Sequence, residues 1–144
     1  DLMDFYQSEA GRDAIGNRSL YLLRNADSKA KGLGFALAGN FYPDFLLWLV
    51  DEATGHQSLS FLDPKGIRNL DLDDPKFGLF REVKNLEAEI GDGNLSLSAF
   101  ILSATDFGDL INSHRIKRCD LEARNVLFMD TGGTRYIQQL LERV

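Results

Sequence analysis

Three ionisable residues, Asp44, Asp63 and Lys65, stand next to prolines in two largely apolar stretches of the chain. The stretches are FYPDFLLW at residues 41–48 and FLDPKG at residues 61–66. Carboxylates that lie close together can hold Mg²⁺, and an ammonium group beside them can stabilise negative charge on a phosphate. These groups suit the hydrolysis of a phosphodiester, which needs an activated water, a neutralised phosphate and a stabilised leaving oxygen.

The spacing of Asp63 and Lys65 puts both side chains on one face of a strand. Side chains alternate along a strand, so the two residues project to the same side, and Pro64 between them offers its carbonyl oxygen as a further potential metal ligand. A proline inside a strand removes one hydrogen bond from the ladder. We therefore expect the chain to splay from its neighbour here and to leave space for a metal ion and a phosphate.

Asp44 can join this pair only if two strands fold back on each other. Residues 43–50 are nearly continuously apolar, as in a strand that is covered on both faces. Residues 57–65 form a second predicted strand, and the turn at residues 55–56 joins the two closely. An antiparallel hairpin of these strands places Asp44, at the start of one, near Asp63, at the end of the other.

Helices and further strands are expected on both sides of this hairpin. Apolar residues at helical spacing predict a helix over residues 1–15, and a strand over residues 19–23 follows it. In the second half, the patterns predict a helix over 75–90, a strand over 95–103, a short helix over 106–112, a strand over 124–129 and a helix over 134–144. Strands that alternate with helices indicate an α/β fold with a mixed central sheet flanked by helices.

The composition is that of one folded domain. The chain has 144 residues, of which 44% are hydrophobic and 26% charged, enough for a single sizeable core and too few for two. No apolar run reaches the roughly 20 residues of a membrane-spanning helix, and the start of the chain lacks the pattern of a signal peptide. The single cysteine, Cys119, excludes an intramolecular disulfide. We therefore expect a soluble, cytoplasmic protein, and the lack of methionine at position 1 suggests a piece of a longer polypeptide.

The net charge limits how this chain could bind nucleic acid by itself. The formal net charge is −6 and the pI is near 4.8. Lys and Arg side chains that neutralise phosphates supply most non-specific affinity for DNA, so we do not expect tight autonomous binding. The limit is weaker if other domains of a larger protein hold the DNA and this one presents the catalytic groups.

The stretches around Asp44, Asp63 and Lys65 resemble the PD-(D/E)xK signature of restriction-endonuclease-like nucleases. With LYLLRN at residues 20–25 and Gly66 after the lysine, they are similar to the C-terminal nuclease domain of type III-like restriction enzymes. The resemblance implies a restriction-endonuclease-like fold and a Mg²⁺-dependent DNA endonuclease, with Mn²⁺ as a substitute metal. It also implies partners: DNA, a helicase-type ATPase motor in the same parent chain, and a modification subunit.

The same resemblance assigns roles to individual residues. Asp44 and Asp63 would ligate Mg²⁺, and Lys65 would orient or activate the attacking water and stabilise charge on the phosphate. Family members often take a further acid from the N-terminal helix, and Glu9 is the candidate because the helical pattern places it near the apolar face. This chain has Asp63 where Glu is commoner, and proline follows it. The shorter acid changes the metal geometry to be expected.

Ordinary structural roles are alternatives for each of these residues. Asp44 could simply begin a strand, residues 63–66 could form a common turn, and Glu9 could be a solvated helix residue. A different function is also open, namely a non-catalytic domain on this fold that serves DNA docking or subunit assembly. Convergence of Asp44, Asp63 and Lys65 on a cleft would favour the nuclease, whereas a surface ion pair of Lys65 would favour the docking domain.

Two basic segments could contact DNA phosphates. One is HRIKR at residues 114–118, and the other contains Lys29 and Lys31 in a predicted loop at residues 25–34. A solvated loop is an equally good explanation of each segment.

Overall fold

The computed structural model describes residues 2–26, 41–69, 71–130 and 133–144, and its centre is a five-stranded sheet with the order β1-β2-β3-β4-β5. The strands are β1 (Arg18–Arg24), β2 (Phe45–Asp51), β3 (Gln57–Lys65), β4 (Leu95–Ser103) and β5 (Val126–Phe128). β1, β2 and β3 pair antiparallel, whereas β3, β4 and β5 pair parallel. The predicted mixed sheet is therefore confirmed.

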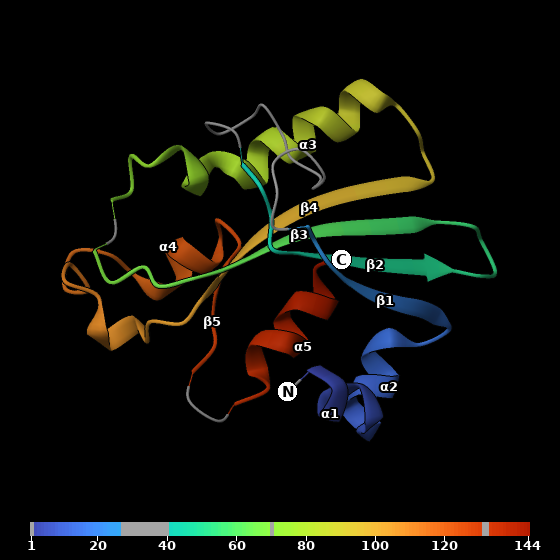
Figure 1. Cartoon of the computed structure of the whole chain (residues 1–144), viewed down its shortest axis with the longest axis horizontal. Coiled ribbons are helices and arrows are strands. Elements are labelled where there is room, and N and C mark those ends of the chain that lie inside the picture. Colours follow the sequence, from blue (N-terminus) through green and yellow to red (C-terminus); the bar gives the residue numbers. More distant parts are fainter. Residues whose placement is uncertain (1, 27–40, 70, 131–132) are drawn as a thin grey trace.

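Helices cover both faces of this sheet, with α3 on one side and α1, α2 and α5 on the other (Figure 1). The α-helices are α1 (Leu2–Gln7), α2 (Glu9–Ile15), α3 (Leu79–Ile90), α4 (Arg118–Glu122) and α5 (Arg135–Glu142). Two 3₁₀ helices add to them, η1 (Pro75–Gly78) and η2 (Phe107–Asp109). Within the described ranges, no helix has the length and apolar character needed to cross a membrane.

The helix predicted over residues 75–90 has clear local signals at both ends. Asp74 accepts a hydrogen bond from the Lys76 backbone N–H at 2.9 Å, and Pro75 occupies the first helical position. The first turn is 3₁₀ and continues into α3. Gly91, with φ of 65°, ends α3, and its N–H bonds to the Glu87 carbonyl at 3.1 Å.

The single helix predicted over residues 1–15 is in fact two helices, which corrects the sequence analysis. The Ser8 hydroxyl accepts a hydrogen bond from the Gly11 N–H at 3.0 Å and donates one to the Phe5 carbonyl at 2.6 Å, so Ser8 caps a new helix. A Cβ atom on Gly11 would lie 1.8 Å from the Phe5 oxygen. Only glycine fits at this break.

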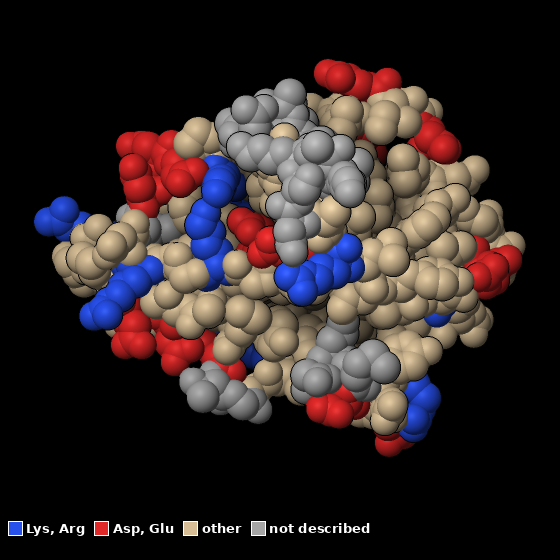
Figure 2. Space-filling model, viewed as in Figure 1, with Lys and Arg blue, Asp and Glu red and all other residues tan. Residues whose placement is uncertain are grey.

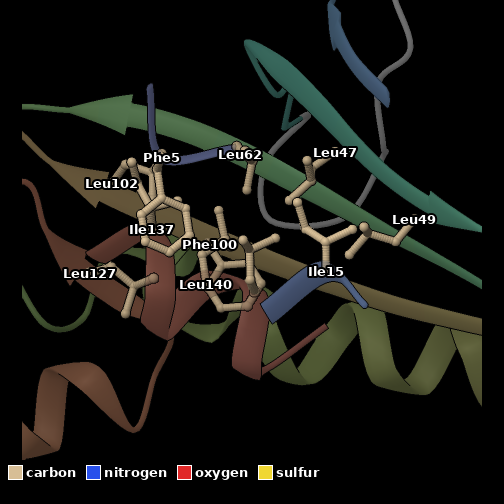
Figure 3. Packing of buried hydrophobic residues seen from close by; sticks show 11 residues of the cluster. Phe5, Ile15, Leu47, Leu49, Leu62, Phe100, Leu102, Leu127, Ile137 and Leu140 are labelled. Carbon is tan, nitrogen blue, oxygen red and sulfur yellow. The ribbon is translucent and has the colours of Figure 1, made fainter. Parts of the chain in front are cut away.

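The two faces of the sheet bury different cores. We call the faces the α5 face and the α3 face, after the long helices that cover them. On the α5 face, one apolar core combines the strands with α1, α2 and α5 (Figure 3); its residues are Phe5, Ile15, Leu47, Leu49, Leu62, Phe100, Leu102, Leu127, Ile137, Leu140 and Leu141.

On the α3 face there are two smaller cores. The α3 core lies under α3 and consists of Phe41, Phe61, Leu79, Val83, Leu97 and Ala99. The α4 core lies under η1 and α4 and consists of Ile67, Phe77, Ile101, Leu110, Leu121, Val126 and Phe128. The chain passes from one core to the other where β3 ends, since Phe61 belongs to the α3 core and Ile67, two residues past the strand, to the α4 core.

Candidate active site

The hairpin of β2 and β3 brings the two predicted metal ligands together, as the sequence analysis predicted. Phe45 pairs with Leu62, so Asp44, one residue before, and Asp63, one residue after, lie at the same end of the hairpin. The pKa of Asp63 is raised, first because the carboxyl group is partly buried, and the negative charge of Asp44 contributes in the same direction. The two carboxylates therefore interact electrostatically.

The expected splaying of the Asp63–Lys65 segment takes a different form. These residues stay paired with β4, where Pro64 lies opposite Leu102. On the other edge of β3, the pairing with β2 ends at Phe45 and Leu62. Among the strands that the structure describes, none pairs with this edge at Pro64, and proline is tolerated at such a position.

Lys65 lies on the same strand face as Asp63 and is joined by a lysine that sequence reasoning missed. The pKa of Lys65 is lowered by the close approach of the Lys76 side chain, by burial and by the positive charge of Lys76, while Asp63 and Asp74 act in the opposite direction. Lys76 also lowers the pKa of Asp63. The site therefore contains two lysines and two aspartates, and the charges of Lys65, Lys76 and Asp44 all affect the pKa of Asp63.

Lys76 reaches the site because η1 docks on the sheet. Phe77, the next residue, is buried in the α4 core, and Asp74 caps the turn that contains both. The capping pattern in the sequence predicted the start of this helix. Its docking beside Lys65 depends on long-range packing, which no local pattern reveals.

A hollow of about 90 Å³ opens beside the two lysines, and neither Asp44 nor Asp63 is among the residues that line it. Its polar lining comes from Lys65, Asn69, Asp71, Asp74 and Lys76. Figure 2 shows acidic and basic side chains next to each other near the middle of the view, over the region where β2 begins and β3 ends. Since a water molecule occupies about 30 Å³ in the liquid, the hollow has room for a few waters or one phosphate group.

The two aspartates fit a Mg²⁺ site whose remaining ligands come from water and from the substrate phosphate. Across the described ranges, no group of three or more His, Cys, Asp or Glu side chains could hold a metal ion. Mg²⁺ needs fewer protein ligands, since one or two carboxylates with waters and substrate phosphate suffice. Asp44 and Asp63 would supply the carboxylates, and the pKa of Asp63 is raised chiefly because its carboxyl group is partly buried.

Glu9 stays outside this group. It begins α2 and is exposed, and α2 packs on the α5 face, where Ile15 enters the core. Asp63 projects to the opposite face together with Phe61 of the α3 core. The structure thus does not bring Glu9 to the two aspartates.

Of the two predicted basic segments, the structure describes the one at residues 114–118. Arg118 is held in place by salt bridges to Glu122 at 2.9 Å and Asp130 at 2.8 Å, and its guanidinium lies 4.9 Å from the centre of the Phe128 ring. Arg118 therefore stabilises the packing of α4. Lys29 and Lys31 lie outside the described residues.

Comparisons of the chain with protein-family models, with curated proteins and with solved structures find no match.

Proposed function

We propose that this chain is a Mg²⁺-dependent DNA endonuclease domain on a restriction-endonuclease-like fold, the cleavage module of a type III-like restriction enzyme. The observation that supports this best is the meeting of Asp44, Asp63 and Lys65 at one end of the β2–β3 hairpin, where Lys65 and a second lysine also line a hollow. A helicase-type ATPase motor in the same parent chain and a modification subunit would deliver the DNA. The enzyme would act in the cytoplasm.

Each residue has a role in the proposed hydrolysis. Bound Mg²⁺ would supply the positive charge that polarises the phosphodiester. Asp44 and Asp63 would hold the ion at the strand ends. Lys76 would help to stabilise the negative charge on the phosphate. The lowered pKa of Lys65 brings this ammonium group closer to exchanging a proton with the attacking water.

The contacts of Lys65 favour an enzyme over the alternative, a docking domain without activity. In the described part of the chain, the salt bridges are those of Lys84 with Glu87 and of Arg118 with its two acids. Lys65 takes part in none of them. A lysine that is not locked in a surface ion pair is available to a substrate phosphate.

A metal titration and a cleavage assay test the proposal together. In calorimetric titrations with Mn²⁺, we expect binding by the wild type, loss of binding in Asp63→Asn, and unchanged binding in the control Asp13→Asn. Asp13 is an exposed acid on α2, on the α5 face. With Mg²⁺ and supercoiled plasmid, nicking should fall at least about 100-fold in Asp63→Asn, since a metal supplies several kcal/mol and each 1.4 kcal/mol is a factor of ten.

Two results would contradict the proposal. Mn²⁺ binding that is the same in Asp63→Asn as in the wild type would place any metal elsewhere. DNA binding by the wild type without nicking, in the presence of either metal, would favour the docking domain.

A further inference from the structure

A second hollow, of about 410 Å³, is lined by the N-terminal end of α3, by α4 and by the segments on either side of α4. Three arginines from separate segments line it, Arg81, Arg115 and Arg124, together with the single acid Asp120. We call this hollow the arginine groove. In a chain whose net charge is −6, such a local excess of positive charge marks a surface suited to an anionic partner.

The arginines are held by local structure rather than by acids. Arg81 is exposed on α3, and its guanidinium lies 5.2 Å from the centre of the Phe80 ring. Arg115 is also exposed, in a turn closed by the hydrogen bond from its N–H to the Asn112 carbonyl at 2.9 Å.

Arg124 owes its position to the residue that follows it. Asn125 has φ of 58°, a left-handed conformation that asparagine tolerates better than most residues. Its side-chain amide donates to the Ala99 carbonyl at 3.1 Å. The turn between α4 and β5 is thereby fixed, and Arg124 is left at the rim of the groove.

The guanidinium groups of the groove remain open to a ligand. Of the salt bridges between described residues, none involves Arg81, Arg115 or Arg124. Arg118, next to the groove in sequence, is by contrast paired with two acids. A guanidinium has five N–H donors in a planar fork that matches the oxygens of a phosphate.

The arginine groove is continuous with the candidate active site. A third hollow, of about 290 Å³, lies around η1. It shares Asp74 and Phe77 with the hollow beside Lys65, and it shares Arg81 and Arg124 with the groove. The third hollow is also lined by the acids Asp73 and Glu82, so the excess of positive charge is confined to the arginine groove.

We infer that the arginine groove binds the phosphate backbone of DNA to one side of the phosphate that is cut. This inference rests on the proposed function, which supplies the polyanion. Guanidinium groups that contact phosphates position the duplex without reading its sequence. The groove would compensate locally for the acidic net charge of the chain.

Side-chain NMR tests the inference directly, because arginine Nε–Hε signals report on each guanidinium and detect weak binding. The wild type and Asp63→Asn are titrated with a 16-base-pair duplex in EDTA, at low and moderate NaCl. In both proteins we expect shifts at Arg81, Arg115 and Arg124. The signal of Arg135, which is exposed at the start of α5, should stay unchanged.

A combined variant measures the contribution of the groove. Replacing Arg81, Arg115 and Arg124 by glutamine should weaken duplex binding at least tenfold at low salt. The slope of log K against log salt should also fall by about one for each lost phosphate contact. The matched control is Arg135→Gln, and an unchanged amide spectrum away from the groove shows that the variant is folded.

Three outcomes would overturn the inference: no shifts in the wild type at millimolar duplex, equal duplex binding by the combined variant, or equal shifts produced by a polyglutamate peptide, which would indicate an acidic protein partner. These outcomes are separate from those for the proposed function. Shifts at the groove together with unaltered Mn²⁺ binding in Asp63→Asn would overturn the metal site and leave the groove as a DNA-binding surface.

Discussion

The two faces of the sheet differ in where their polar and charged side chains lie. On the α5 face, one apolar core runs from β2 to β5 (Figure 3). Its buried serines Ser60 and Ser98 hydrogen-bond to each other across the strands at 2.7 Å. On the α3 face, Asp63 and Lys65 lie between two separate cores. One face thus pairs its buried strand hydroxyls with each other, and the other places charged groups between its cores.

The path of β3 shows where the second face is interrupted. Phe61 belongs to the α3 core and Ile67, just past the strand, belongs to the α4 core. Between them, burial raises the pKa of Asp63, so its ionised form is less stable than in water. Perturbed charges in a gap between cores are typical of functional sites. The difference between the faces therefore separates a part built for stability from a part suited to chemistry.

The largest expected effect is on the α5 face. Phe100 is 2% exposed in the middle of its core, so Phe100→Ala should lower the free energy of unfolding by about 3–5 kcal/mol. The control is Ile111→Ala, at a side chain that is 60% exposed, and it should change stability by about 0.5 kcal/mol or less. Urea unfolding at pH 7 measures both, and equal effects would refute the contrast between core and surface.

A second prediction concerns the serine pair. Ser60→Ala leaves the buried Ser98 hydroxyl without its partner, which should lower the free energy of unfolding by about 1–3 kcal/mol. The double variant removes both hydroxyls and should cost clearly less than the sum of the two single changes. A double-mutant cycle by urea unfolding gives this coupling. Additive effects would mean that the hydrogen bond is not stabilising.

Much of the fold could be predicted because its signals are local. The strand predicted over residues 57–65 coincides with β3, and the strand predicted over 43–50 is β2 with slightly different ends. α4 and the break at Ser8 were missed, since short helices and single caps produce weak patterns. The expectation that both faces of β2 are covered was wrong at Trp48, which is 36% exposed.

The candidate site could be predicted only as far as strand pairing determines it. The alternation of side chains and the hairpin place Asp44, Asp63 and Lys65 together. Lys76 arrives through the docking of η1, a contact between distant parts of the chain. Glu9 had only its helical position to support it, and the face of the sheet on which α2 packs cannot be read from that position.

The pH dependence of stability should differ in sign between two aspartates. The folded-state pKa of Asp63 is raised above its ordinary value of 3.8, chiefly by burial. Ionisation of Asp63 therefore costs stability, and this cost is absent at low pH and complete above the folded-state pKa. Asp63→Asn should match the wild type at low pH and be at least as stable at pH 7.

Asp51 is the matched control for this prediction. Hydrogen bonds from the backbone N–H groups of Thr54 and Ala53 lower its pKa, so its stabilisation is present at pH 7 and is lost as the pH falls. Asp51→Asn should therefore be less stable than the wild type at pH 7, and the difference should vanish in acid. Urea unfolding between pH 3 and pH 7 measures both variants, and the same sign for both would contradict the pKa shifts.

The smallest expected effect is a change in the pKa of one lysine, without a large change in stability. Because the close approach of the Lys76 side chain is the main cause of the lowered pKa of Lys65, Lys76→Met should raise the pKa of Lys65 toward its ordinary value of 10.5. Lys84→Met is the control, since Lys84 pairs with Glu87 at 2.7 Å on α3. NMR titration of ¹³C-methylated lysines follows Lys65 in both variants. A pKa of Lys65 that does not respond to Lys76→Met would mean that the two lysines titrate independently.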